Sequence, residues 1–116
     1  MTKHIFFLRH FETKNNVNGI LNGQSLEEPI SAGHCIEKCF PFDIIYCSTA
    51  LRCRQTVEWI EGHNKIFFSE QLLERNLGLL EGHSRIEMQK QYPELFDKNR
   101  LNVFATPPEG ESYNEF

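Results

Sequence analysis

Three short apolar runs, each bounded by polar residues, predict buried β-strands. The runs are rich in aromatic or β-branched side chains and are too short for helices. They are Ile5 to Leu8, Ile44 to Cys47 and Ile66 to Phe68. Segments with helical signals lie between and after them, so the order of elements predicts an α/β fold with a parallel sheet.

The predicted helices are marked by a capping residue at one end and by glycine, proline or an aromatic residue at the other. They run from Ser31 to about Cys39, from Ser48 or Thr49 to about Glu61, and from Ser84 to about Tyr92. The stretch from Asn15 to Pro29 has no clean period and is predicted to be a long loop, of the kind that is often functional. Near the end of the chain, Ser112 and Glu115 have capping-box spacing, which predicts the start of a further helix.

Length and charge narrow the class of protein. The 116 residues suit one domain over residues 1–116 with a single core. A formal net charge of -4 with interspersed signs disfavours binding to nucleic acid or to an acidic membrane surface, so we expect a small-molecule partner. No apolar run reaches the roughly 20 residues of a membrane span, and the apolar start is too short for a signal peptide. These features predict a cytoplasmic protein with reduced cysteines.

Candidate chemistry follows each predicted strand. Arg9 and His10 come directly after the first, at the sheet edge where parallel sheets bind ligands, and together suit an anion. Arg52 follows the second strand at the start of a helix, where a cation opposes the helix dipole unless an anion binds there. Glu74 and Glu81 follow the third strand, and a carboxylate near a phosphate could protonate a leaving oxygen, although solvated charges beside a turn would look the same.

Taken together, these clusters resemble the histidine phosphatases, in the phosphoglycerate mutase-like branch. The resemblance rests on five elements in order: Arg9 to Thr13 with Asn16; Asn22-Gly23 followed by Pro29 to Ser31; Ser48, Arg52 and Thr56; Leu72, Glu74, Gly78, Glu81 and Gly82; and Pro108 to Ser112. It implies a three-layer α/β/α fold, incomplete at its C-terminal side.

The resemblance also implies roles. His10 would attack phosphorus and carry the phosphoryl group, and Arg9 and Arg52 would neutralise the phosphate oxygens. Glu74 would act as general acid and then as base. Substrate-binding positions would be Thr13, Asn16, Asn22 and Gly23. Neither a metal ion nor another cofactor is implied, because the arginines supply the positive charge.

Two departures from the family pattern affect the expected activity. Phe11 stands where the family has glycine after the nucleophile, which affects pocket shape. A second histidine, which the family carries after an apolar strand near its C-terminus, is not found. We therefore expect a truncated domain with weak or no activity. Three explanations stay open: a fragment of a longer protein, a natural truncation, or a sheet completed in a homo-oligomer or by another chain.

Three alternatives stay open. Within enzymes, the chain could catalyse phosphoglycerate mutase-type phosphoryl transfer. A non-catalytic pseudoenzyme that only binds phosphate would account for Phe11 and for the lack of a second histidine. A metal site of His34, Cys35 and Cys39 is the least favoured alternative, because a fourth ligand and the usual Cys-x-x-Cys spacing are both missing.

Overall fold

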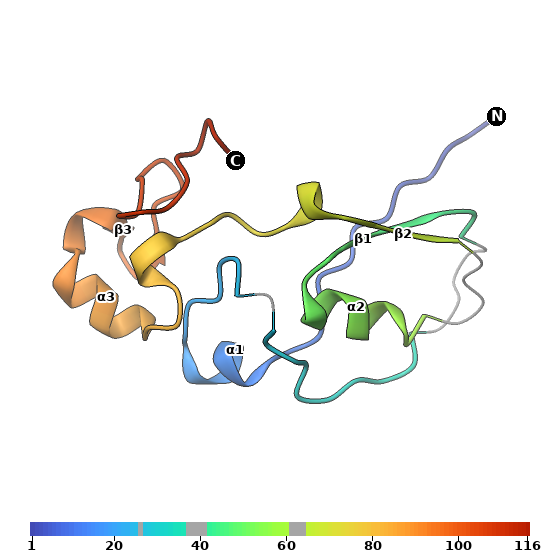
Figure 1. Ribbon diagram of the computed structural model, residues 1–116, viewed down its shortest axis with the longest axis horizontal. Helices are drawn as coiled ribbons and strands as arrows, with labels where there is room; N and C mark the ends of the chain where they lie inside the picture. The colour runs from blue at the N-terminus through green and yellow to red at the C-terminus, as the bar shows by residue number, and fades with distance from the viewer. Residues whose placement is uncertain (26, 37–41, 61–64) are drawn as a thin grey trace.

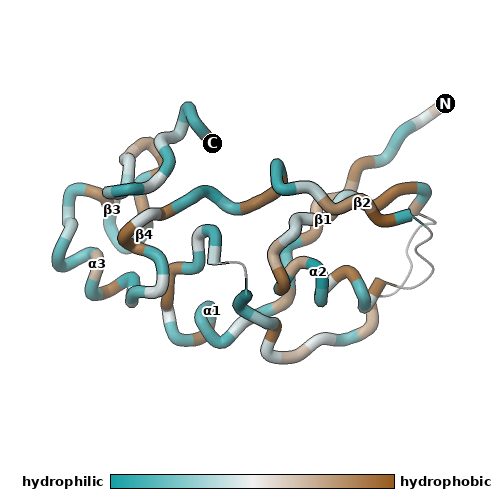
Figure 2. The backbone as a smooth tube through the Cα atoms, viewed as in Figure 1, coloured by the Kyte–Doolittle hydropathy of each residue, from teal (hydrophilic) through white to brown (hydrophobic). Residues whose placement is uncertain are grey.

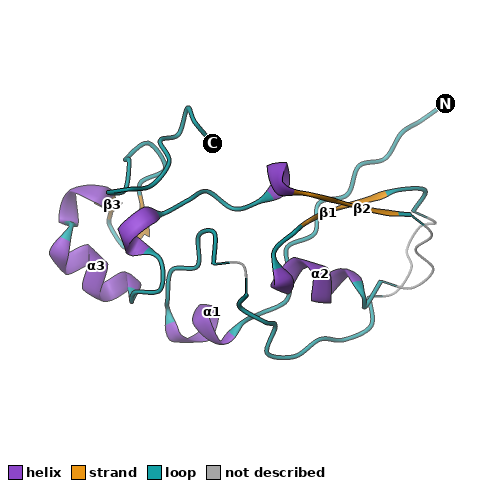
Figure 3. Cartoon of the chain, viewed as in Figure 1, coloured by secondary structure: helices purple, strands orange, loops and turns teal. Residues whose placement is uncertain are grey.

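The computed structural model describes residues 1–25, 27–36, 42–60 and 65–116. One half of the molecule contains a two-stranded parallel sheet of β1 (Ile45–Ser48) and β2 (Ile66–Ser69), with Ile45 opposite Ile66. Helix α2 (Leu51–Val57) follows β1 directly and packs along the sheet (Figures 1 and 3). This β–α–β unit confirms the predicted α/β class and the parallel pairing of the second and third apolar runs. With two strands, the sheet is that of an incomplete α/β fold.

The other half of the molecule is built around α3 (Arg85–Gln91), which confirms the helix predicted from Ser84. Short 3-10 helices precede and follow it, at Gly78–Leu80 and Pro93–Leu95. They lead into an antiparallel pair of two-residue strands, β3 (Phe96–Asp97) and β4 (Arg100–Leu101).

Each half has its own small apolar core, so the single core expected from chain length is wrong. Cys47, Val57 and Ile60 form one cluster beneath the parallel sheet. Leu77, Leu80, Met88 and Leu95 form the second, around α3. The radius of gyration is 16.1 Å, whereas a compact domain of this length has about 13 Å, and the molecule is correspondingly elongated at 47 × 31 × 23 Å.

The predicted strand at Ile5 to Leu8 does not form. Residues 1–12 have no regular secondary structure, and Ile5 and Phe7 are 79% and 96% exposed. Figure 2 shows this hydrophobic stretch running out beside the sheet toward the N-terminus. A strand needs a hydrogen-bonded ladder with a neighbouring strand and a layer over its side chains. Within the described residues this segment joins no ladder, and its main side-chain contact is the edge-to-face packing of Phe6 on Phe42, with centroids 5.6 Å apart.

The face of the sheet that points away from the cluster of Cys47, Val57 and Ile60 is also exposed among the described residues. Tyr46 and Phe67 are cross-strand neighbours with ring centroids 5.7 Å apart, and they are 67% and 50% exposed. Parallel sheets in complete α/β folds are covered on both faces. The exposed aromatic pair therefore marks where this fold is incomplete.

Two further predictions about local structure are corrected. The expected helix from Ser31 is absent over residues 31–36, where the Ile36 N–H instead donates to the Trp59 carbonyl at 2.9 Å; residues 37–41 lie outside the described residues. The predicted loop from Asn15 contains α1 (Lys14–Asn18), a five-residue helix that ends at Gly19 in the left-handed conformation. Helix α2 is shorter than predicted at both ends: Ala50 is its N-cap, and it ends at Val57 rather than near residue 61.

The capping box predicted near the C-terminus forms without a helix. The Ser112 N–H donates to Glu115 Oε2 at 2.7 Å and the Glu115 N–H donates to Ser112 Oγ at 3.2 Å. The box closes a single turn, in which the Phe116 N–H donates to the Ser112 carbonyl at 3.2 Å.

Among the residues that the structure describes, no helix is long and apolar enough to cross a membrane.

Candidate active site

His10 lies half-buried in the irregular segment before α1. Its Nδ1 is 2.6 Å from the Phe11 carbonyl oxygen, and because a carbonyl can only accept, Nδ1 carries the proton. The lone pair of the neutral ring is then on Nε2. The Phe11 N–H donates in turn to Oγ1 of buried Thr56 on α2 at 2.9 Å, which holds the segment against the helix. The local fold therefore leaves Nε2 as the ring nitrogen with an available lone pair.

A cavity of about 220 Å³ adjoins the imidazole and is lined by Arg9, His10, Glu12 and Asn16. Arg9 brings a guanidinium and Asn16 an amide, both of which donate hydrogen bonds to anions. Glu12 adds a carboxylate, which suits a ligand hydroxyl better than a phosphate oxygen. Three of the residues predicted from the sequence thus line one cavity.

Arg52 is only 3% exposed, and its guanidinium reaches across to the turn after α1. Nη2 donates to the Gly23 carbonyl at 3.0 Å and Nη1 donates to the Ser25 carbonyl. Nε is buried and has no hydrogen-bond partner within the described residues. A cation held by neutral carbonyls keeps its positive charge, but Arg52 is not among the residues that line the cavity beside His10.

The charges of three predicted residues act on the imidazole. Burial is the main cause that lowers the pKa of His10 below its usual 6.5, and the positive charges of Arg52 and Arg9 lower it further. The hydrogen bond to Phe11 and the negative charge of Glu74 raise the pKa, with a smaller combined effect. Although they are far apart in sequence, Arg52 and Glu74 therefore lie within electrostatic reach of His10.

Thr13 and Asn16 form the capping box of α1. Thr13 is fully buried, and its Oγ1 accepts from the Asn16 N–H at 3.2 Å and lies 3.1 Å from Asn16 Oδ1. Asn16 Oδ1 also accepts from the Thr13 N–H at 3.0 Å. The Thr13 hydroxyl is thus used within the turn, whereas Asn16 lines the cavity and its Nδ2 makes no hydrogen bond to the described residues.

Asn22 and Gly23 lie in the turn that Arg52 contacts. Asn22 Oδ1 accepts from Asn15 Nδ2 at 2.7 Å, and the Gly23 carbonyl accepts from Arg52. Gly23 has a φ of +48°, and a Cβ there would lie 2.2 Å from Glu81 Oε1. The structure therefore uses both residues to shape the turn beside the arginine.

Glu74 is exposed in the segment after β2, and its Oε1 accepts from the Arg75 N–H at 2.8 Å. Arg75, which the sequence analysis did not single out, is 7% exposed and donates to three carbonyls, those of Val103, Ala105 and Glu111, at 2.6 to 2.9 Å. Arg75 thereby holds the C-terminal segment against the base of the Glu74 loop.

Phe11 does not line the cavity. Its ring packs on the ring of His34, with centroids 4.7 Å apart. A bulky side chain after His10 is therefore accommodated outside the cavity that His10 lines.

Thr56 and Glu81 are functional candidates whose roles sequence reasoning missed. Both belong to the motifs that carry the family resemblance, and this was the available signal. Thr56 accepts from the Phe11 N–H, 45 residues away, and Glu81 accepts from the Gln24 N–H, 57 residues away. Contacts over such separations could not be predicted from the spacing of the motifs.

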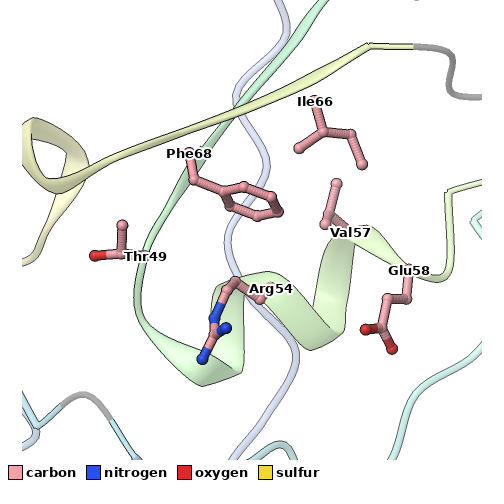
Figure 4. Close-up of a pocket in the computed structure, with 6 residues that line it drawn as sticks. All are labelled: Thr49, Arg54, Val57, Glu58, Ile66 and Phe68. Carbon is pink, nitrogen blue, oxygen red and sulfur yellow. The ribbon is translucent and has the colours of Figure 1, made fainter.

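A second, larger hollow of about 410 Å³ lies between α2 and β2 (Figure 4). Val57, Ile66 and Phe68 provide its apolar side, and the exposed side chains of Arg54 and Glu58 stand at its edge. None of the predicted site residues lines it. Arg54 is thus exposed beside this hollow and does not line the cavity beside His10.

No group of three metal-ligating side chains occurs within the described parts of the chain. Of the alternative metal site, Cys39 lies outside the described residues, and the ring of His34 packs on Phe11.

Comparisons with known proteins agree with this geometry. A family model, the histidine phosphatase superfamily (branch 1), matches residues 5–116. Probable phosphatase C1687.21 of Schizosaccharomyces pombe is 32% identical over 96 residues, which cover 74% of this chain and 46% of that protein. Broad-specificity phosphatase YOR283W of Saccharomyces cerevisiae is 30% identical over 100 residues, covering 74% and 44%. The chain thus spans about half the length of these curated relatives.

Solved structures match over most of the chain. A protein of Escherichia coli K-12 that is assigned as an alpha-ribazole-5'-P phosphatase superposes with a TM-score of 0.70 at 20% identity, covering 94% of this chain and 59% of that one. The protein TTHB049 of Thermus thermophilus superposes with a TM-score of 0.67 at 26% identity, covering 91% and 62%. The fold is therefore shared although the sequences have diverged.

Proposed function

The chain belongs to the histidine phosphatase superfamily, and on that basis we propose that it is a phosphomonoesterase that acts on a small phosphorylated metabolite through a phosphohistidine at His10. The observation that carries the proposal is the hydrogen bond from His10 Nδ1 to the Phe11 carbonyl. It leaves the Nε2 lone pair available, and the lowered pKa keeps the ring neutral at neutral pH.

The proposed reaction has two displacements at phosphorus. His10 Nε2 attacks in line, the bond from phosphorus to the alcohol oxygen breaks, and Glu74 donates a proton to that oxygen. A water molecule then attacks the phosphohistidine, Glu74 takes its proton, and the bond from phosphorus to nitrogen breaks to release phosphate and neutral His10. Atoms and charges balance without a metal ion or another cofactor.

The surrounding residues support binding of the phosphate. Arg9 and the Asn16 amide lie beside His10, and Arg52 brings a buried positive charge. Asn22 and Gly23 form the turn that holds Arg52, and Thr13 holds Asn16 through the cap of α1. The described geometry therefore supports direct contact by Asn16 and positioning by the other three predicted binding residues.

The test is to incubate the folded chain with p-nitrophenyl phosphate and to search for an acid-labile phosphoryl group on the peptide that contains His10. We expect label and weak turnover, both lost in His10→Ala. The control is His83→Ala, because His83 is an exposed imidazole that is not among the residues lining the cavity. Absence of both label and turnover in a folded sample would remove the proposal.

A non-catalytic phosphate-binding role is the second candidate, and one observation favours it. Two of the five N–H groups of Arg52, one on Nη1 and one on Nη2, already donate to backbone carbonyls, so part of its hydrogen-bonding capacity is used within the fold. Such a site can hold a phosphate without stabilising the transition state. Binding of inorganic phosphate without any label on His10 would select this role over the first.

A further inference from the structure

We propose that Glu81 is a positioning residue whose carboxylate fixes the turn at residues 22–25. The carbonyls of this turn thereby orient the guanidinium of Arg52 for an anion at His10. The inference rests on the proposed function and adds to it a residue that does not touch the substrate. Glu81 lies on the α3 side of the molecule, whereas Arg52 lies on α2.

The turn itself is tightly specified. The Ser25 N–H donates to the Asn22 carbonyl at 2.8 Å, and Gly23 has a positive φ whereas Gln24 does not. A positive φ at the first central position alone is the pattern of a type II′ turn, which favours glycine at that position. The base of the turn is fixed by backbone bonds, because the Leu21 N–H donates to the His83 carbonyl at 3.0 Å and the Gly82 N–H donates to the Leu21 carbonyl at 2.8 Å.

A single peptide unit connects Glu81 to Arg52. Glu81 Oε1 accepts from the Gln24 N–H at 2.8 Å and also from the Leu77 N–H at 2.9 Å. The N–H of Gln24 and the carbonyl of Gly23 belong to the same trans peptide, so they point in opposite directions. The carbonyl accepts from Arg52 Nη2 at 3.0 Å. Holding the N–H therefore also orients the carbonyl that binds the guanidinium.

The arrangement keeps the two charges apart. No carboxylate forms an ion pair with Arg52 among the described residues, and a neutral peptide stands between Glu81 and the guanidinium. A direct Glu81–Arg52 pair would have neutralised the positive charge. Instead the acid orients the arginine through the peptide, and the buried cation remains available for an anion.

The close approach of Gly23 to Glu81 leaves no room for a side chain. A Cβ on residue 23 would lie 2.2 Å from Glu81 Oε1 and 2.7 Å from its Cδ. Gly23→Ala should therefore displace the carboxylate from the Gln24 N–H, and it provides a second perturbation of the same contact without removing Glu81.

The experiment measures binding of inorganic phosphate by isothermal titration calorimetry, together with thermal unfolding of each variant. Glu81→Ala removes the acceptor and should weaken phosphate binding about tenfold or more, the effect of losing one charge-assisted hydrogen bond. Glu81→Gln keeps an Oε1 acceptor without the charge and should remain within about threefold of the wild type. Glu87→Ala removes an exposed carboxylate on α3 and should leave phosphate binding unchanged.

The outcomes separate this inference from the proposed function. Failure of the wild-type chain to bind phosphate would count against the proposed site as a whole. Binding by the wild type with equal binding by Glu81→Ala would overturn the role of Glu81 alone, and equal losses in Glu81→Ala and Glu81→Gln would overturn hydrogen-bond acceptance as its basis. If Glu81→Ala does not fold, Gly23→Ala decides, and unchanged phosphate affinity in that folded variant would overturn the inference.

Discussion

Replacing Thr56 by valine tests how α2 supports the segment that carries His10. Thr56 is 3% exposed, its Oγ1 accepts from the Phe11 N–H at 2.9 Å, and its hydroxyl donates to the Arg52 carbonyl at 2.7 Å. Valine has nearly the same shape, so Thr56→Val leaves no cavity and removes only the hydrogen bonds. The Phe11 N–H then loses its partner, which costs about 1–3 kcal/mol for a buried donor.

We expect Thr56→Val to lower the free energy of unfolding by about 2 kcal/mol, which in urea lowers the midpoint by roughly 1 M. Thr56→Ser keeps the hydroxyl and loses one methyl group, at a cost of about 1 kcal/mol. Thr106→Val, at an exposed threonine, serves as the control for the change of residue type and should remain within about 0.5 kcal/mol of the wild type. The valine variant at 56 should therefore be the least stable of the three.

The same variants report on the site. The Phe11 carbonyl is the acceptor for His10 Nδ1, so releasing the Phe11 backbone should broaden or shift the nitrogen signal of His10 in an NMR spectrum. The reasoning is refuted if Thr56→Val is as stable as Thr56→Ser and leaves the His10 signal in place.

Three further predictions follow from local geometry and burial. Gly78→Ala should destabilise the fold by roughly several kcal/mol in a urea titration, because its Cβ would lie 2.1 Å from the Pro108 carbonyl oxygen. The control is Gly19→Ala, which has a similar positive φ but open space around the Cβ and should cost only about 1 kcal/mol. Burial raises the pKa of Cys47 to about 11, so iodoacetamide at pH 8 should alkylate Cys47 about a hundredfold more slowly in the folded chain than in the urea-unfolded chain, as followed by peptide mass spectrometry; equal rates would contradict the burial. The His10 imidazole should titrate below pH 6.5 by NMR, and its neutral, nucleophilic form should be lost only as pH falls through that lowered pKa; a midpoint above 6.5 would contradict the cause assigned.

Local signals in the sequence predicted the elements that local interactions can form. The helix from Ser84 and the parallel pair β1–β2 were correctly predicted, because capping residues and short apolar runs act within a few residues. The strand at Ile5 to Leu8 was wrong because a strand also needs a neighbour and a cover from elsewhere in the fold. Helix α1 was missed because the Thr13–Asn16 capping box replaces the usual glutamate or glutamine by asparagine.

The candidate site could be predicted in part. The resemblance to a family singled out Arg9, His10 and Asn16, which line one cavity, and Arg52 and Glu74, whose charges act on His10. Spacing alone could not have joined them, since each cluster taken by itself is also typical of solvated surface charge. What the sequence did not predict is how these groups are held, because that depends on backbone atoms far away in the chain.

The placement of the site explains why its supports are spread so widely. Residues 19–25 run between the two small cores: their backbone pairs with residues 82–85 on the α3 side, and their carbonyls bind Arg52 from α2. Neither core alone contains both the buried guanidinium and the acid that orients its turn. An anion bound at His10 and Arg52 should therefore stabilise the junction between the two halves as well as the site, since any ligand that binds only the assembled form shifts the equilibrium toward it. Phosphate should accordingly slow hydrogen exchange at the amides of Gln24 and Gly82 as strongly as at Phe11, and protection confined to Phe11 would show that the two halves are not coupled through this turn.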